Sequence, residues 1–134
     1  MKTLKLTTLL LAVALVFGST SCKYEEGPAL SLRTKKARIA GEWNIEKYVD
    51  ANGNETPETD SPVITFEKDG KGEVSYTFLG TTTTIPFEWE FTDSKKKLKI
   101  DIDGSSDEEE ILRLTNEEMW TVDTDGEETH YKAK

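Results

Sequence analysis

Cysteine and histidine are almost missing from this chain of 134 residues, which contains one of each. One cysteine excludes an internal disulfide framework, and one histidine excludes a metal site built from several imidazoles. A Ser-His-Asp arrangement would depend wholly on His130. We expect His130 to be an exposed residue of a terminal strand. We therefore predict no catalytic residue, no metal site, no cofactor and no enzymatic activity.

Positive charge is also scarce. The chain has 17 Lys and Arg residues against 26 Asp and Glu residues, which gives a net charge of −9. This balance repels phosphate backbones and argues against nucleic acid as a partner, so we predict no nucleic-acid binding. It also argues against docking onto anionic lipid by charge alone.

Long hydrophobic runs are missing as well. The longest apolar stretch, residues 6–17, would span about 18 Å as a helix at roughly 1.5 Å per residue, which is short of a hydrocarbon core of about 30 Å. Lys2 and Lys5 precede this stretch, and the small residues 18–21 follow it, directly before Cys22. These are the three regions of a secretory signal peptide. We assign residues 1–21 to it, which leaves a mature chain of one domain with a net charge of about −11.

Cys22 stands where a bacterial lipoprotein has its acylated cysteine. The resemblance implies that the sulfur of Cys22 carries a diacylglycerol and that the new α-amino group is acylated. Several acyl chains would make membrane attachment effectively permanent. The resemblance thus implies a protein held at the outer membrane by lipid.

Residues 22–30 are polar and contain Gly27-Pro28, which is typical of a flexible tether. Glu25 and Glu26 fit a solvated linker. They also resemble the acidic export signal that follows the lipidated cysteine in surface lipoproteins of some Gram-negative anaerobes. That resemblance implies a location on the cell surface, with the periplasmic leaflet as the alternative.

Residues 31–134 are predicted to form the folded domain. Residues 31–40 suit one short helix, with Ser31 as N-cap and Gly41 as the stop. After Gly41 the apolar residues recur with a period of two, which predicts eight half-buried strands. The alternating residues are Trp43 and Ile45; Ile64 and Phe66; Val74, Tyr76 and Phe78; Ile85, Phe87, Trp89 and Phe91; Leu98, Ile100 and Ile102; Leu112 and Leu114; Trp120 and Val122; and Tyr131.

Turn-forming dipeptides separate these strands. Asn52-Gly53, Asp69-Gly70, Asp103-Gly104 and Asp125-Gly126 favour tight antiparallel hairpins. Residues 51–61 are the exception, because they are too long for a tight turn, and we interpret them as a lid or flap loop. We therefore predict an all-β fold, an eight-stranded antiparallel up-and-down barrel with a short N-terminal helix. The rival is a two-sheet sandwich, which would need several long connections.

The stretch Gly41-Glu42-Trp43 after a short helix resembles the Gly-x-Trp opening of lipocalins. Residues 22–40 and the stretch from Leu114 to Trp120 resemble lipocalin-like domain lipoproteins of Gram-negative anaerobes. The resemblance implies a barrel closed at one end by the helix, with Trp43 packed over it. Two lipocalin features are missing, a Thr-Asp-Tyr stretch and an Arg on the last strands that would stack on Trp43. These departures imply a shortened relative, and the resemblance carries a fold more than a function.

Two acidic stretches have part of the spacing of a calcium-binding loop. Asp103 and Glu110 fit an EF-hand, but Lys99 would stand in the first ligand position, and in residues 123–126 the last ligand would be Lys132. We interpret both stretches as hairpin turns. The acids 107–110 could offer a carboxylate pair for glycoside hydrolysis only inside a cleft, and we expect them to be solvated.

The barrel interior is the remaining candidate site. An eight-stranded barrel is just wide enough to be filled by side chains or to hold one small ligand. Two alternatives stay open, a solid core and a partly open cup lined by Phe66, Tyr76 and Trp89; a cavity of at least about 300 Å³ would support the cup. Nine aromatic residues are expected to point inward: Trp43, Phe66, Tyr76, Phe78, Phe87, Trp89, Phe91, Trp120 and Tyr131.

Two functions follow from these alternatives. A cup predicts a membrane-tethered module that binds a small hydrophobic ligand. A solid core predicts an accessory lipoprotein whose acidic outer face or 51–61 loop contacts another surface protein. The sequence leaves the oligomeric state open.

Overall fold

The computed structural model describes residues 33–134. Cys22, Glu25 and Glu26 lie outside the described residues, as do the expected signal peptide (1–21) and tether (22–30). In the described part no helix is long and apolar enough to cross a membrane. The elements are α2 (Lys35–Ile39), β1 (Gly41–Val49), β2 (Glu55–Pro57), β3 (Val63–Phe66), β4 (Lys71–Phe78), β5 (Thr81–Thr92), β6 (Lys97–Ile102), β7 (Ser105–Leu114), β8 (Glu118–Val122) and β9 (Glu128–Ala133).

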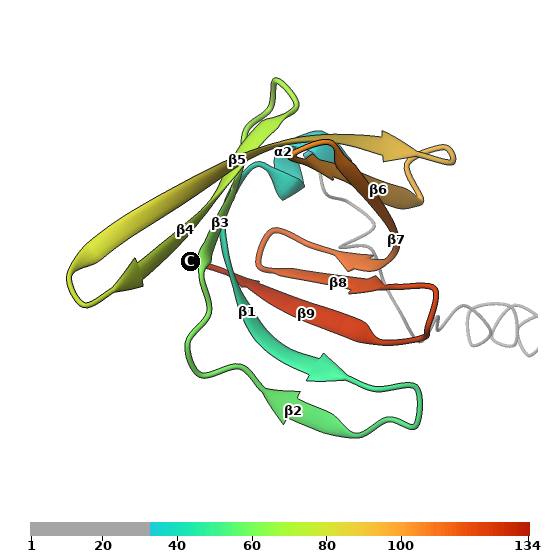
Figure 1. The fold of residues 1–134 in the computed structure, drawn as a ribbon. Coiled ribbons are helices and arrows are strands. Elements are labelled where there is room, and N and C mark those ends of the chain that lie inside the picture. Colours follow the sequence, from blue (N-terminus) through green and yellow to red (C-terminus); the bar gives the residue numbers. More distant parts are fainter. Residues whose placement is uncertain (1–32) are drawn as a thin grey trace, which may run out of the picture.

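The strands close into a barrel (Figure 1). Strands β3 to β9 pair antiparallel in chain order, and both β3 and β9 pair with β1, so the eight strands β1 and β3–β9 form a ring. The predicted eight-stranded antiparallel barrel is therefore confirmed. Closure removes the free sheet edges that an open meander would expose.

The 51–61 segment, which we interpreted as a lid or flap loop, contains a short strand. This strand, β2, pairs with Lys47–Val49 of β1 along the edge where β3 pairs with Gly41–Asn44. Strand β2 thus lengthens the barrel wall beyond the end of β3. The four predicted glycine turns are confirmed, because Gly53, Gly70, Gly104 and Gly126 all have positive φ angles, between 81° and 89°.

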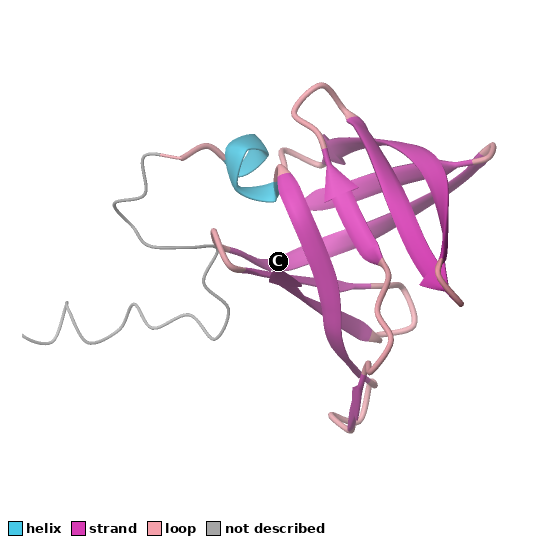
Figure 2. Ribbon diagram, turned by 90° about the vertical axis from the view of Figure 1, so that its left-hand side faces the viewer, coloured by secondary structure: helices cyan, strands magenta, loops and turns pink. Residues whose placement is uncertain are grey.

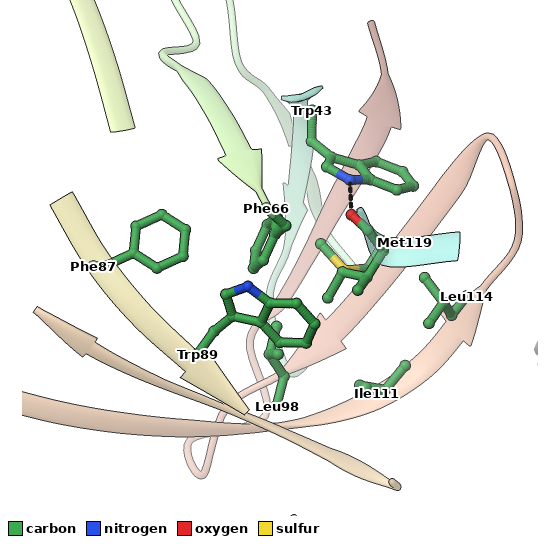
Figure 3. Packing of buried hydrophobic residues seen from close by; sticks show 9 residues of the cluster. Trp43, Phe66, Phe87, Trp89, Leu98, Ile111, Leu114 and Met119 are labelled. Carbon is green, nitrogen blue, oxygen red and sulfur yellow. Dashed lines mark hydrogen bonds between the residues drawn. The ribbon is translucent and has the colours of Figure 1, made fainter. Parts of the chain in front are cut away.

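Helix α2 is shorter than predicted and begins later. Its N-cap is Thr34 instead of Ser31, with Thr34 Oγ1 accepting from the Ala37 amide at 3.1 Å. The indole nitrogen of Trp43 donates to the Ile39 carbonyl at 2.8 Å (Figure 3). Lys35 Nζ also donates to the Lys95 carbonyl. Figure 2 shows the helix lying against one end of the barrel, as the resemblance implied.

The hydrophobic core fills this helix-covered half. Phe66 packs edge-to-face against Phe87 and Trp89, with ring centroids 5.3 and 5.7 Å apart. Gly72 leaves the space for the Phe87 ring, since a Cβ there would overlap that ring. The buried hydrophobic residues are Ile39, Trp43, Phe66, Phe87, Trp89, Leu98, Ile111, Leu114 and Met119.

Two aromatic residues expected inside lie beyond the barrel rim. Tyr76 is 47% exposed and Phe78 is 74% exposed. Strand β4 pairs with β3 only as far as Ser75, and β5 pairs with β6 only from Glu88 onward, so the end of the β4–β5 hairpin projects freely (Figure 1). The expectation that Tyr76 and Phe78 point into the barrel was wrong because β4 and β5 extend beyond the ends of the neighbouring strands β3 and β6.

Trp120 and His130 also differ from expectation. On β8 the buried residues are Met119 and Thr121, so Trp120 faces outward. Its ring stacks on His130 at 4.2 Å between centroids, and His130 Nε2 lies 2.7 Å from Glu128 Oε2. His130 is therefore only 6% exposed, and the expectation of an exposed histidine was wrong.

Candidate functional site

A cavity of about 250 Å³ lies inside the barrel at the end opposite α2. It is formed by β6, the first half of β7 and the middle of β9, near the β6–β7 turn. The helix contacts the other ends of these strands, since Lys35 reaches Lys95 before β6 and Arg38 reaches Leu114 at the end of β7. The lining residues are Leu98, Ile100, Ile102, Ser105, Ser106, Asp107, Glu109 and Tyr131.

The cavity has two walls of different chemistry. Strand β6 presents Leu98, Ile100 and Ile102, because every second residue of a strand faces the same side. The polar wall adjoins the apolar wall, because β7 pairs with β6 and presents Glu109 beside Leu98, and β9 adds Tyr131. An apolar wall with a few convergent polar groups is typical of small-molecule sites.

Glu109 is the most unusual group in this wall. Burial raises the pKa of its carboxyl, and the negative charges of Asp107, Asp123 and Glu127 raise this pKa further, while the Thr121 hydroxyl lowers it. Such a carboxyl ionises less readily than a solvated one, and a positive partner would favour its charged form. Perturbed acids in cavities are candidates for functional groups.

Tyr131 completes the polar wall, and Thr121 of β8 lies next to Glu109 and Tyr131 but outside the cavity lining. Burial raises the pKa of the Tyr131 hydroxyl well above its usual value, so the phenol stays neutral. The Thr121 side chain is 1% exposed, and its Oγ1 has no hydrogen-bond partner among the described residues. This hydroxyl is nevertheless near enough to Glu109 and Tyr131 to affect the pKa of both. A buried hydroxyl without a partner carries a desolvation penalty of about 1–3 kcal/mol.

The structure separates the three residues predicted to line a cup. Phe66 and Trp89 meet in the packed core and are nearly fully buried, whereas Tyr76 lies on the projecting hairpin (Figure 3 shows the first two). Tyr76 lines a different hollow, which it shares with Phe78 and residues 60–63. None of the three belongs to the lining of the interior cavity, and a role for them in binding stays a prediction.

The interior therefore lies between the two alternatives that the sequence left open. The helix-covered half is packed, and the other half holds a cavity of about 250 Å³, somewhat below the 300 Å³ expected of a ligand cup. This volume equals that of roughly eight molecules of liquid water. We call this cavity the cup.

Sequence reasoning missed Glu109, which it placed among solvated acids. A bulge between Ile111 and Arg113 shifts the register of β7, so that Ile111 and Leu114 are buried instead of Leu112 and Leu114. Counting back by twos from Ile111 would have placed Glu109 and Asp107 inside.

The same bulge helps to place Arg113 opposite Trp120, with its guanidinium 5.2 Å from the ring centroid. An Arg–Trp pair thus exists on the last strands, but on the outer face instead of over Trp43.

The two stretches with calcium-loop spacing are hairpin turns, between β6 and β7 and between β8 and β9. Within residues 33–134, no group of three or more His, Cys, Asp and Glu side chains is arranged to hold a metal ion.

Comparison with known proteins agrees with this architecture. The family model of the lipocalin-like domain matches residues 39–120. A lipocalin-like protein from Bacteroides uniformis superposes with a TM-score of 0.62 at 15% identity, covering 72% of this chain and 99% of its own. An uncharacterized protein from Bacteroides eggerthii superposes with a TM-score of 0.61 at 12% identity, with the same coverage of both chains. No curated protein matches the chain. Because the family model covers more than half of the residues, the chain belongs to the lipocalin-like domain family.

Proposed function

We propose that the protein is a membrane-tethered binding protein that takes a small apolar or amphipathic molecule into the cup. The observation that carries this proposal is the cup itself, whose lining combines Leu98, Ile100 and Ile102 with Glu109 and Tyr131. A fully packed barrel would have no interior role beyond stability. Here one half is packed and the other half is left open to a ligand.

Native mass spectrometry of the purified protein tests this proposal. We expect a co-purified adduct, or a rise in melting temperature with at least one member of a lipid panel. Ile100→Trp should abolish either signal because the indole would fill the cup. Thr82→Trp is the control, since it places the same ring on the exposed hairpin. No adduct and no thermal shift would contradict ligand binding.

The tether is the second part of the proposal and rests on the sequence around Cys22. We propose that a lipid on Cys22 holds the domain at the outer membrane, and that Glu25 and Glu26 direct it to the cell surface. Cys22→Ala should abolish incorporation of a labelled fatty acid. Replacing Glu25 and Glu26 by Ala should protect the protein from protease added to whole cells. Unchanged protease sensitivity would contradict the surface signal.

A second candidate function is a scaffold that contacts another surface protein. It is favoured by the free end of the β4–β5 hairpin, where Phe78 and Leu79 are exposed. Residues 74–87 carry no charge, in a chain of which 32% of the residues are charged. Exposed apolar surface of this kind often marks a protein contact. The absence of any adduct or thermal shift would favour this candidate over ligand binding.

A further inference from the structure

The polar wall of the cup has the chemistry of a site for a positive charge. Asp107 and Glu109 are the charged residues of the lining, and no Lys, Arg or His is among the residues that line this cavity. We propose that the cup selects a primary amine, an ammonium group on a small apolar body. This inference rests on the proposed function and names its ligand class.

The placement of the acids beside apolar residues is the geometric observation behind this proposal. An ammonium group has three donors and no acceptor. The lining offers acceptors in the Asp107 and Glu109 carboxylates and the Tyr131 side chain. Across the β6–β7 pairing, Asp107 lies beside Ile100 and Glu109 beside Leu98, so an ammonium group on an apolar body would meet an acceptor and an apolar contact together.

The electrostatics of the wall favour a cation over an anion. Asp107, Asp123 and Glu127 already oppose the ionisation of Glu109. A ligand carboxylate would add one more negative charge, whereas an ammonium would offset the charge of Glu109 and form a charge-assisted hydrogen bond with it. The Tyr131 ring adds an aromatic face to which a cation is attracted.

The apolar wall sets the size of the ligand body. Leu98, Ile100 and Ile102 can cover a hydrocarbon group, and a volume of about 250 Å³ suits one ring with a short tail. Three probes share such a body and differ in charge: phenethylamine, 2-phenylethanol and phenylacetate. Their comparison separates the charge of the head group from the contribution of the ring.

Calorimetric titration of the purified protein with these three probes tests the inference. We expect phenethylamine to bind at least about tenfold more tightly than 2-phenylethanol, equivalent to about 1.4 kcal/mol, and phenylacetate to bind weakest. Glu109→Gln should weaken amine binding about tenfold or more. Glu110→Gln is the matched control on the same strand, because Glu110 is exposed and outside the lining. Melting temperatures of both variants verify that they fold.

The pH dependence of binding gives a second readout. Affinity for phenethylamine should rise with pH as Glu109 loses its proton, while the amine stays charged. The groups that face Glu109 are Asp107 of β7, Thr121 of β8, Asp123 and Glu127 of the β8–β9 turn, Tyr131 of β9 and, beyond Tyr131, Tyr48 of β1. In Glu109→Gln this rise should disappear; an unchanged rise would contradict the role of Glu109.

The outcomes separate this inference from the proposed function. Equal or tighter binding of 2-phenylethanol or phenylacetate would overturn the selection for an amine and leave the cup as a ligand site. If none of the three probes binds but native mass spectrometry shows an adduct that Ile100→Trp removes, the amine inference fails alone. If neither signal is seen, both proposals fail.

Discussion

The two halves of one barrel differ in what their inward-facing residues do. At the α2 end, Trp43, Leu114 and Met119 are fully buried in a cluster with Ile39 of the helix. At the other end the inward positions of β7, β8 and β9 hold Glu109, Thr121 and Tyr131. Both halves have the same strand alternation, and they differ in which side chains the strands and the bulge in β7 bring to the interior. The packed half stabilises the barrel, and the polar half has groups that a folded core alone would not need.

Trp43→Ala should have the largest effect on stability because it removes a large side chain from the packed half. The indole is fully buried and donates to Ile39, so its loss leaves a cavity beneath α2 and an unpaired carbonyl. We expect a loss of about 3–5 kcal/mol in the free energy of unfolding. Denaturant unfolding measures it. A loss below about 1 kcal/mol would show that the helix end is not the stabilising half.

Thr121→Val should act in the opposite direction because it touches the polar half. The variant removes a buried hydroxyl that has no partner in the described part of the chain, and we expect a gain of about 1 kcal/mol. Thr115→Val is the matched control, since Thr115 Oγ1 accepts from the amides of Glu117 and Glu118 at 3.1 and 2.9 Å. We expect the free energy of unfolding of this control to fall by about 1 kcal/mol. Destabilisation of both variants alike would contradict the contrast between the two halves.

Glu109→Gln should change how stability depends on pH. Burial raises the folded-state pKa of Glu109 above the ordinary 4.5, so the folded chain holds this proton more tightly than the unfolded chain. The stability contributed by the protonated carboxyl is fully present below about pH 4.5. It is lost as the pH rises through the raised folded-state pKa. Denaturant unfolding of both proteins from acid to neutral pH should show that the free energy of unfolding of the variant rises relative to that of the original chain. The effect is smaller than that of Thr121→Val, because the carboxyl keeps some contact with solvent. A difference in unfolding free energy that stays the same at every pH would contradict a raised pKa of Glu109.

Phe78→Ser should have the smallest effect on stability. The side chain lies on the free end of the β4–β5 hairpin and is mostly exposed, so we expect a change within about 0.5 kcal/mol. Phe87→Ala, on the same hairpin but in the core, should cost about 3–5 kcal/mol. Thermal unfolding compares the two. Similar losses would show that the projecting hairpin packs on the barrel.

The barrel was predictable because its signals are local. Strands with period two and glycine turns such as Asp69-Gly70 specify antiparallel neighbours, and the number of strands favours closure. The Gly41-Glu42-Trp43 stretch likewise identified the helix-covered end correctly. These features depend on residues within one or two strands of each other.

The cup was not predictable because it depends on how far each strand extends and where each strand bulges. Alternation places Tyr76 and Phe87 on the same face, but only the pairing with β3 and β6 shows which of them still lies inside the barrel. The bulge in β7 moved Glu109 to the interior without any glycine or proline to mark it. The buried, unpaired Thr121 hydroxyl is visible only when three strands are assembled.

The most direct test of the contrast between the halves is the isoleucine methyl NMR spectrum with and without phenethylamine. Ile100 and Ile102 line the cup, and Ile39 lies in the packed end, so one residue type reports on both halves. We expect the methyl signals of Ile100 and Ile102 to shift on titration while that of Ile39 stays unchanged. Unchanged Ile100 and Ile102 signals at saturating amine, or a shift confined to Ile39, would contradict the contrast between the halves.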